Sequence, residues 1–539
     1  MSADRFSLPS RASADRSPTR RDVLKSGAAL AAASVAAPLG VPGLGLFSNA
    51  FAATSKRSTL PTPRHDKLPR WRGFNLLEKF MSYDNKPFRE DDFRNVADLG
   101  FNFVRLPMDY RCWIVDGDRK RFNEKTLAEI DKAVEYGDKY GVHVCMNFHR
   151  APGYTVANPP EKPSVWEDAE TLAVCAEHWR VFAKRYAGFP NELVSFNLFN
   201  EPAGCSDEAF MKVVSTVVDA IRSEDADRLI SCDGLGYGTR PYLPLAKLRV
   251  AQATRGYTPM EVSHCGASWV NYKDFPAPRW PAVSHNALLP QPNKGELSAA
   301  VRRPWTLDGP FPNDATLRLR VGTVSVAAEI VVEADGREIF RRRFVPKGGK
   351  GEWKEAVFVQ AYNVYQNVYD LDLTVKIPNG AKRLTVANVD GDWATVTELA
   401  ISAPNVAEVV SEGGPDWNAK EPTAFQYSLE NGNASLTGGV VKDRAWLKKT
   451  CVEPWQDAEK HGIGVMVGEF GAFNKTPIDV VRRWLEDMLI NWREAGWGWA
   501  LWNFRGSFGI ADSGRADVDY EDWRGLKLDR ETLKLLQKY

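Results

Sequence analysis

Two glutamates occupy positions in the sequence where a catalytic pair of carboxylates can be expected. Glu201 follows the apolar run 193–199, and Glu469 follows the apolar run 464–468. An acidic residue at the end of an apolar strand is rarely buried without a purpose. Two carboxylates that flank a glycosidic bond can break it, because one donates a proton to the leaving oxygen while the other attacks the anomeric carbon. We therefore interpret Glu201 and Glu469 as candidates for this chemistry.

The elements around these glutamates alternate between short apolar strands and amphipathic helices. Helical spacing of apolar residues predicts helices at 123–141, from Ser206 as N-cap, at 443–460 and from Pro477, with Thr476 as its N-cap. Strands are expected at 71–77, 101–106, 142–148, 193–199, 228–232, around 249–263, at 464–468 and at 498–502. Eight strands alternating with helices predict parallel β/α units, and hence an α/β fold of the (β/α)8 barrel type.

The pattern changes between about 310 and 404, where apolar and polar residues alternate with period two. Runs such as 316–321, 327–332 and 371–377 show this alternation, and Asp335-Gly336 between two runs is a hairpin signal. This predicts an antiparallel β-sandwich inserted between the sixth and seventh barrel strands. The expected domains are a signal peptide at 1–53, barrel segments at 54–290 and 440–539, and at 291–439 the sandwich with a linker from about 405.

In a (β/α)8 barrel, the catalytic groups lie at the carboxyl ends of the strands. The predicted strands end in polar or aromatic residues that would share this mouth: Asn75, Arg105, His149, Asn200, Glu201, Glu469 and Trp502. Glutamates at the ends of strands four and seven would lie on opposite walls. A separation of about 5–5.5 Å between their carboxyl groups would dictate retention of the anomeric configuration.

Several of these strand ends carry motifs that resemble glycoside hydrolase family 5, the cellulase-like family. The segment Ser195-Phe-Asn-Leu-Phe-Asn-Glu-Pro202 is similar to its acid/base strand, and Val467-Gly-Glu-Phe-Gly471 to its nucleophile strand. The stretches 104–107, 147–154 and 499–503 are similar to its second, third and eighth strands. The resemblance covers roughly 71–290 and 440–539 and does not extend to the inserted sandwich.

The resemblance implies a role for each matching residue. Glu201 would protonate the leaving oxygen and later deprotonate water, and Glu469 would form the covalent glycosyl-enzyme. Asn200 would bond the sugar 2-hydroxyl, and Arg105 would hold Glu469 ionised, because an adjacent guanidinium favours the charged carboxylate. Arg105 could instead be a structural ion-pair partner.

His149 would line the glycone site, and Trp502 would form the floor beneath the sugar ring. A satisfied core histidine and a plain core tryptophan are the alternatives for these two. The sequence departs from the family at the sixth strand, which usually has a histidine two residues before a tyrosine but here reads Arg255-Gly-Tyr257. Tyr257 can still bond the nucleophile, and His264 resembles a downstream motif of some glucan-active members.

Further aromatic residues could contact additional sugar units or could belong to the core. Trp166, Trp269, Trp280 and Phe508 fall on predicted βα loops. The sandwich resembles carbohydrate-binding-type modules, and its aromatics could form a binding face, its core or a wall of the cleft: Trp353, Tyr362, Tyr365, Tyr369 and Trp393. We favour a cleft-shaping or accessory role for this insertion.

Composition and the N-terminus limit the partners. Lys and Arg total 70 and Asp and Glu total 69, so the net charge is only +1 and does not favour binding to nucleic acid or to an anionic membrane. Seven scattered cysteines argue against a disulfide framework or a metal site, and we expect a monomer with no cofactor and no metal. Residues 19–25 resemble a twin-arginine export signal, with an apolar run at 26–47 and a cleavage site at 50–52. Proline and glycine break that run, so no membrane anchor is expected.

The resemblance therefore implies a retaining β-glycosidase that acts on β-linked glucans, as an endo- or exo-glucanase. The alternatives are the same mechanism on β-mannan or β-1,3-glucan, or transglycosylation. A carbohydrate-binding protein on a non-catalytic barrel is the remaining alternative, and the presence of both Glu201 and Glu469 argues against it.

Overall fold

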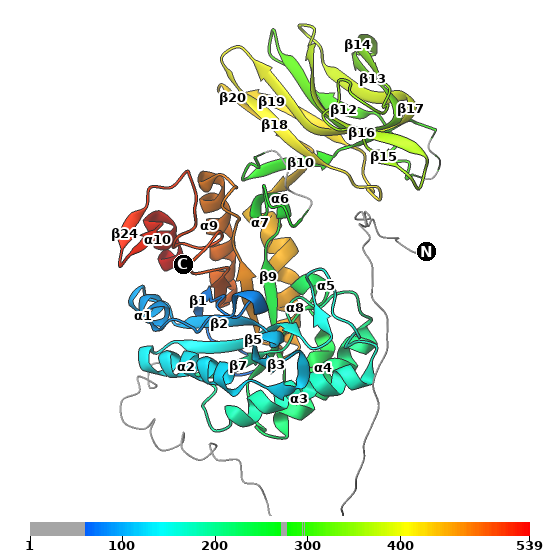
Figure 1. The fold of residues 1–539 in the computed structure, drawn as a ribbon. Coiled ribbons are helices and arrows are strands. Elements are labelled where there is room, and N and C mark those ends of the chain that lie inside the picture. The colour runs from blue at the N-terminus through cyan, green and yellow to red at the C-terminus, as the bar shows by residue number, and fades with distance from the viewer. Residues whose placement is uncertain (1–59, 271–276, 294, 296) are drawn as a thin grey trace, which may run out of the picture. The chain divides into compact units, whose positions relative to one another are not determined.

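The computed structural model describes residues 60–270, 277–293, 295 and 297–539, and its first domain is a closed barrel (Figure 1). The barrel strands are β1 (Arg72–Asn75), β2 (Phe103–Asp109), β5 (His143–Ala151), β7 (Val194–Asn197), β8 (Ile230–Asp233), β9 (Ala251–Gly256), β22 (Val465–Phe470) and β23 (Trp499–Leu501). Each pairs in parallel with its neighbours in chain order, and β1 pairs with both β2 and β23, which closes the ring. The predicted (β/α)8 barrel is confirmed.

Helices follow most of the barrel strands. They are α1 (Glu90–Asp98), α2 (Glu124–Tyr140), α3 (Ala169–Arg185), α4 (Asp207–Arg222), α5 (Leu235–Gly238), α6 (Met260–Ser263), α7 (Arg444–Leu447), α8 (Glu453–Lys460), α9 (Ile478–Ala495) and α10 (Arg530–Lys538). The side chain of Ser206 caps α4 as predicted, by accepting from the Ala209 amide. The face of α4 that carries Phe210, Val213, Val217 and Ile221 is buried, as its helical spacing predicts.

The prediction that Thr476 caps helix α9 is wrong. The Thr476 hydroxyl donates to the Val262 carbonyl, 2.7 Å away. The free amide at the start of the helix, that of Ile478, donates instead to Asp517 at 2.7 Å. A carboxylate from a later loop therefore satisfies this helix end, and sequence spacing does not reveal such a distant partner.

Close contact between strands fixes the barrel's geometry. All seven residues of β2 are buried, as expected for a parallel strand covered on both faces. A Cβ at Gly73 in β1 would lie 1.7 Å from the Phe103 carbonyl oxygen of β2, so only glycine fits there. The strand ends are consequently held at fixed positions relative to one another.

A second, all-β domain lies between β9 and β22 in the sequence. Its strands are β10 (Ala282–Asn286), β11 (Leu288–Pro290), β12 (Trp305–Asp308), β13 (Thr316–Ala334), β14 (Arg337–Phe344), β15 (Phe358–Val359), β16 (Val364–Lys376), β17 (Arg383–Ala403), β18 (Val406–Gly414), β19 (Ala424–Glu430), β20 (Asn433–Thr437) and β21 (Val440–Lys442). They pair mainly antiparallel, around a core of their own that includes Leu319, Ile330 and Val386. At the two ends of the domain, β10 and β21 pair, with Ala282 opposite Lys442.

Two details of this domain differ from the sequence prediction. The runs 316–321 and 327–332 form one continuous strand, β13, with register shifts between Val321 and Ala328. The expected linker from about 405 contains β18, β19 and β20. These strands bury few residues, such as Phe425, Tyr427 and Leu436, so their apolar alternation in the sequence is weak. The hairpin at Asp335-Gly336 joins β13 to β14.

Smaller strands complete the described structure. Strands β3 (Ile114–Val115) and β4 (Asp118–Phe122) form a hairpin, β6 (Tyr154–Thr155) pairs with the end of β5, and β24 (Glu521–Trp523) pairs with β25 (Leu526–Leu528). Six cysteines are free thiols: Cys112, Cys145, Cys175, Cys205, Cys232 and Cys451. Among the residues described, no helix has the length and apolarity needed to cross a bilayer. The export signal expected at 1–53 lies outside the described residues.

Candidate active site

Arg105 connects several strand ends at the mouth of the barrel. It is 1% exposed, and its Nη1 donates to Glu469 Oε1 at 2.5 Å and to Asn75 Oδ1 at 3.1 Å. Its Nη2 donates to Asn200 Oδ1 at 2.9 Å, and its Nε donates to Asn197 Oδ1 at 3.1 Å. Partners from β1, β7 and β22 therefore hold this guanidinium in one orientation.

Glu469 lies in β22 and is 3% exposed. Its Oε1 accepts from Arg105 and from Arg255 Nη2, the latter at 3.2 Å. The Tyr257 hydroxyl donates to its Oε2 at 3.2 Å. Two guanidinium groups and a phenol thus surround this buried carboxylate and satisfy both of its oxygens.

The backbone of Glu201 is held from two sides. Its φ of +51° lies in the left-handed region, which a non-glycine residue adopts only under strain that its surroundings enforce. Its amide donates to Asp233 Oδ2 at 2.8 Å, and its carbonyl accepts from the Tyr154 hydroxyl at 2.6 Å. These two bonds hold the backbone from which the Glu201 side chain extends to Arg255.

The carboxyl group of Glu201 differs in environment from that of Glu469. Its side chain is 18% exposed, and among the described residues it accepts only from Arg255 Nε, at 3.0 Å. Burial raises the pKa of Glu201 to about 7; Arg255 opposes this shift, while the charges of Glu469 and Asp233 add to it. At neutral pH, Glu201 can therefore carry a proton while its side chain contacts the charged Arg255.

Asn200 and His149 lie beside the pair. Asn200 Oδ1 accepts from both Arg105 and Arg255, so only its amide group is left to bond a ligand. Its Nδ2 lies 3.5 Å from His149 Nε2. Burial and the charge of Arg105 lower the pKa of His149 well below its usual value, so the ring is neutral. The His149 Nδ1 is buried and has no hydrogen-bond partner in the part of the chain that the structure describes, which distinguishes this residue from a satisfied core histidine.

Trp502 is half-buried rather than part of the core. Its ring stacks on His149 with centroids 5.6 Å apart, and Phe80 meets both rings edge-on. A partly exposed aromatic ring at the mouth of the barrel can support a sugar ring.

A second aromatic group lies beside Tyr257. His264, 9% exposed, and Phe508 meet Tyr257 edge-on, and burial lowers the pKa of His264 to about 4. Trp269 contacts His264 and Phe508 and is 58% exposed. Its accessibility suits sugar stacking.

The other aromatics named from the loops are mostly covered. Trp280 is 2% exposed and donates to Asp487, so it is a core residue and cannot stack on sugar. Phe508 is also buried, while Trp166 is half-buried. In the inserted domain Tyr369 is buried, whereas Tyr362 is 67% exposed and Trp353, Tyr365 and Trp393 are half-buried.

Sequence reasoning missed Asp233 and did not foresee the position of Arg255. Asp233 ends β8, is fully buried and contacts both Arg255 and the Glu201 amide. It is an acidic residue at the end of an apolar strand, which is the same signal that identified the glutamates. Asn197, four residues before Glu201, is likewise not identified from the sequence. Its side chain bonds Arg105 and Asp233.

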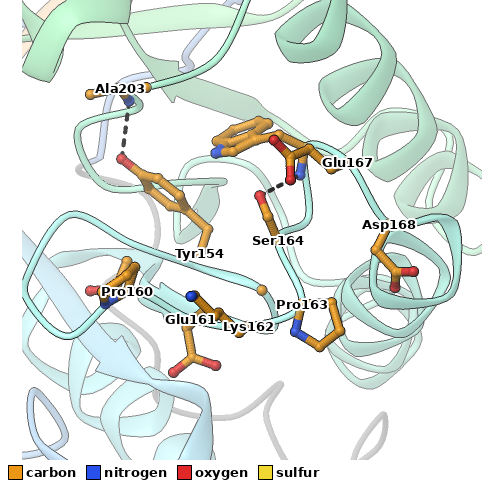
Figure 2. A pocket seen from close by; sticks show the side chains of 13 residues that line it. Tyr154, Pro160, Glu161, Lys162, Pro163, Ser164, Glu167, Asp168 and Ala203 are labelled. Atoms are coloured by element: carbon orange, nitrogen blue, oxygen red, sulfur yellow. Dashed lines mark hydrogen bonds between the residues drawn. The ribbon is translucent and has the colours of Figure 1, made fainter. Parts of the chain in front are cut away.

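Two cavities open beside this site. One, of about 560 Å³, is lined by the segments 153–155, 160–164 and 166–168 and by Ala203 and Gly204. Figure 2 shows the Tyr154 hydroxyl bonded to the Ala203 amide at its edge. The other, of about 480 Å³, shares Asn75 with the network around Arg105. Within the described parts of the chain, no three His, Cys, Asp or Glu residues are placed to hold a metal ion.

Comparisons with known proteins agree with this arrangement. Residues 63–267 match the family model for cellulase, glycosyl hydrolase family 5. Endoglucanase C of Acetivibrio thermocellus is 29% identical over 208 residues, which cover 36% of this chain and 60% of that endoglucanase. A probable glucan 1,3-beta-glucosidase A of Aspergillus fumigatus is 27% identical over 145 residues, covering 26% of this chain and 34% of that protein.

A solved structure described as a glycoside hydrolase aligns with 87% of this chain and 99% of its own, with a TM-score of 0.56 and 26% identity. The alignment with Endoglucanase C leaves about two fifths of that relative unmatched. The family model and the endoglucanase relatives agree with the closed barrel: within this chain, residues 63–267 are similar to the cellulase family, glycosyl hydrolase family 5.

Proposed function

We propose that this protein is a retaining β-glycosidase that hydrolyses β-linked glucans by double displacement. One observation carries the proposal: Glu201 and Glu469, from strands β7 and β22, both accept from the guanidinium of Arg255 but have different surroundings. Burial raises the pKa of Glu201 to about 7, while Arg105, Arg255 and Tyr257 all donate to Glu469. Unequal surroundings of two neighbouring carboxyl groups separate an acid from a nucleophile.

The reaction then proceeds in two balanced steps. First, a Glu469 oxygen bonds the anomeric carbon while the glycosidic carbon–oxygen bond breaks, and its electron pair stays on the leaving oxygen, which takes the proton of Glu201. Second, Glu201, now ionised, removes a proton from water, whose oxygen attacks the anomeric carbon and releases Glu469. Both glutamates return to their starting states.

Neighbouring residues have supporting roles in this proposal. Arg105 and Tyr257 orient Glu469 through its two oxygens. The Asn200 amide, whose oxygen is occupied, donates to the sugar 2-hydroxyl, a bond that strengthens in the transition state. His149 and Trp502 form the glycone side, and His264 stands behind Tyr257.

The substrate class rests on the relatives. Endoglucanase relatives support a β-glucan, and the glucan 1,3-beta-glucosidase relative keeps β-1,3-glucan as the second candidate. Product sizing on a panel of β-1,4-glucan, β-1,3-glucan and β-mannan distinguishes these substrates, and endo from exo attack.

The decisive test is capture of the covalent intermediate. Incubation with activated 2-deoxy-2-fluoro glycosides of several sugars should add one glycosyl mass, and peptide mapping should place it on Glu469. The matched control Glu469→Gln should take up no label. Absence of any adduct across all sugars, in protein that is folded, would refute the covalent mechanism.

Export belongs to the same proposal. The twin-arginine motif at 19–25 supports delivery of the folded protein across the bacterial inner membrane. Replacing both arginines, Arg20→Lys with Arg21→Lys, should leave the precursor inside the cell, as detected by fractionation. Unchanged export of the double variant would contradict this part of the proposal.

A further inference from the structure

Arg255 occupies the position on the sixth barrel strand where glycoside hydrolase family 5, which this sequence resembles, usually has a histidine. It is 5% exposed and lies opposite Glu469 in the pairing of β9 with β22. Its Nε donates to Glu201 Oε1 at 3.0 Å, and its Nη2 donates to Asn200 Oδ1 at 2.8 Å and to Glu469 Oε1 at 3.2 Å. One guanidinium thus contacts both catalytic carboxylates.

Asp233 accompanies Arg255 in the same buried network. Its Oδ2 accepts from Arg255 Nη2 and, at 2.8 Å, from the amide of Glu201. Its Oδ1 accepts from Asn197 Nδ2 at 3.1 Å. Asp233 therefore contacts the backbone of the residue whose side chain Arg255 contacts.

The charges in this network balance only if one proton is present. Two guanidinium groups, Arg105 and Arg255, lie among the three carboxyl groups of Glu201, Asp233 and Glu469. A buried net charge is costly, so two cations favour two anions and one neutral acid. Glu201 is the carboxyl group whose pKa burial raises to about 7.

The other titratable side chains beside Glu201 do not alter this balance. Burial raises the pKa of Tyr154 and of Tyr257 well above its usual value, and it lowers that of His149 well below. All three are neutral near pH 7. The proton count of the site is therefore set by the five charged groups.

If Arg255 were present without Asp233, the site would favour loss of the Glu201 proton. With two guanidinium groups and only the two glutamates, the site would be neutral when both glutamates are ionised. Asp233 adds the third negative charge, so that one proton is again required. Burial opposes the charge of Arg255, but Asp233, Glu469 and Glu201 raise its pKa above the usual value, so it stays a cation.

We propose that Arg255 and Asp233 are a matched pair of positioning residues: Arg255 holds Glu201 in place of the family's histidine, and Asp233 cancels the added charge so that Glu201 keeps the proton it gives to the leaving oxygen. This inference rests on the proposed function. A guanidinium only donates hydrogen bonds, so Glu201 Oε1 accepts from Arg255 and the transferable proton sits on Oε2. Because arginine does not lose its proton near neutral pH, this support does not titrate, whereas a histidine would.

The two charges predict opposite effects on the alkaline limb of kcat/KM, where Glu201 loses its proton. Asp233→Asn removes a negative neighbour and should move this limb to lower pH, by about 1 unit or more. Arg255→Gln removes a positive neighbour and should move it to higher pH. The double variant should return the limb near that of the native protein.

A comparison of substrates with poor and good leaving groups tests whether Arg255 positions Glu201. Arg255→Gln should lower kcat by about 10–100-fold on unactivated oligosaccharides and less on aryl glycosides with good leaving groups, because only the former need the proton. The matched control is Arg228→Gln, since Arg228 is 3% exposed and paired with Asp225 just before β8. It should leave the alkaline limb unchanged.

The outcomes separate this inference from the proposed function. If the native protein forms no adduct on Glu469, the proposed function fails. If the adduct forms but Asp233→Asn and Arg255→Gln leave the limb unchanged, or move it in the same direction, the matched pair is overturned. If Arg255→Gln does not fold, Arg255→His replaces it, because imidazole is neutral above about pH 6.5 and the same upward shift is expected.

Discussion

At the mouth of the barrel, charged side chains are buried against one another, whereas in the inserted domain most of them pair at the surface. Arg105, Asp233, Arg255 and Glu469 are each at most 5% exposed. In the inserted domain, pairs such as Arg341–Glu338 and Arg343–Asp390 are exposed, and its central cluster is apolar.

This difference separates two uses of charge. Surface ion pairs in high dielectric contribute little to stability. Buried ion pairs have a large desolvation cost, so they are retained where their charge acts on something else. In this chain, the four buried charged residues at the mouth of the barrel all belong to the network around the two candidate catalytic glutamates.

The largest expected effect tests the barrel side of the comparison. Glu201→Gln removes the transferable proton and should lower kcat/KM by about 10²–10⁴-fold on substrates with poor leaving groups. Aryl glycosides with good leaving groups should lose much less. Steady-state kinetics on both substrate classes measures this, and equal losses on both would contradict the acid role of Glu201.

The next prediction tests the separate core of the inserted domain. Leu319→Ala, at a fully buried position of β13, should reduce the free energy of unfolding of that domain by about 2–5 kcal/mol. Hydrolysis of a small aryl glycoside at low temperature should persist. The matched variant Ile221→Ala in α4 should instead make unfolding and loss of activity coincide. Activity lost in step with the Leu319→Ala transition would show that the two cores are not separate.

The pH dependence follows from Glu201. The pKa of Glu201 is raised to about 7, and the acid form is the active one. Activity should therefore be retained below pH 7 and should fall about tenfold per unit above it. A pH profile of kcat/KM on an oligosaccharide measures this limb. Full activity at pH 9 would be inconsistent with a single protonated Glu201.

The smallest effect is expected at the surface of the inserted domain. Arg341→Ala removes contacts with Glu338 and Glu329 that lie in solvent, so neither the unfolding midpoint nor kcat should change measurably. Parallel thermal scans of this variant and the native protein check it. A marked loss of stability would show that surface charge supports this domain after all.

The sequence predicts the barrel well, because its strands are short continuous apolar runs and its helices have clear apolar faces. It also predicts that Arg105 and Tyr257 contact Glu469. It does not reveal Asp233, because the partner that explains this residue, Arg255, lies on the next strand, and in the sequence Arg255 is only a departure from a family pattern.

Strands β18 to β20 were missed for another reason. Only a few of their residues are buried, and their turns are formed by the same small polar residues that a linker would have. The sequence places Trp280 on a loop, where it is a candidate for sugar stacking, but its burial depends on contact with α9, which the sequence does not reveal. Alternation and spacing predict local structure, whereas packing partners distant in the chain decide the rest.

The pairing of Ala282 with Lys442 has a consequence for how the protein is made. Arg255 and Glu469 are 214 positions apart, so a ribosome releases the first before the second has been synthesised. When the inserted domain folds, this pairing brings its two ends together and replaces a long loop by a short one, which reduces the entropic cost of joining β22 to β9. The contact between Arg255 and Glu469 can form only after β22 has been synthesised and has joined β9.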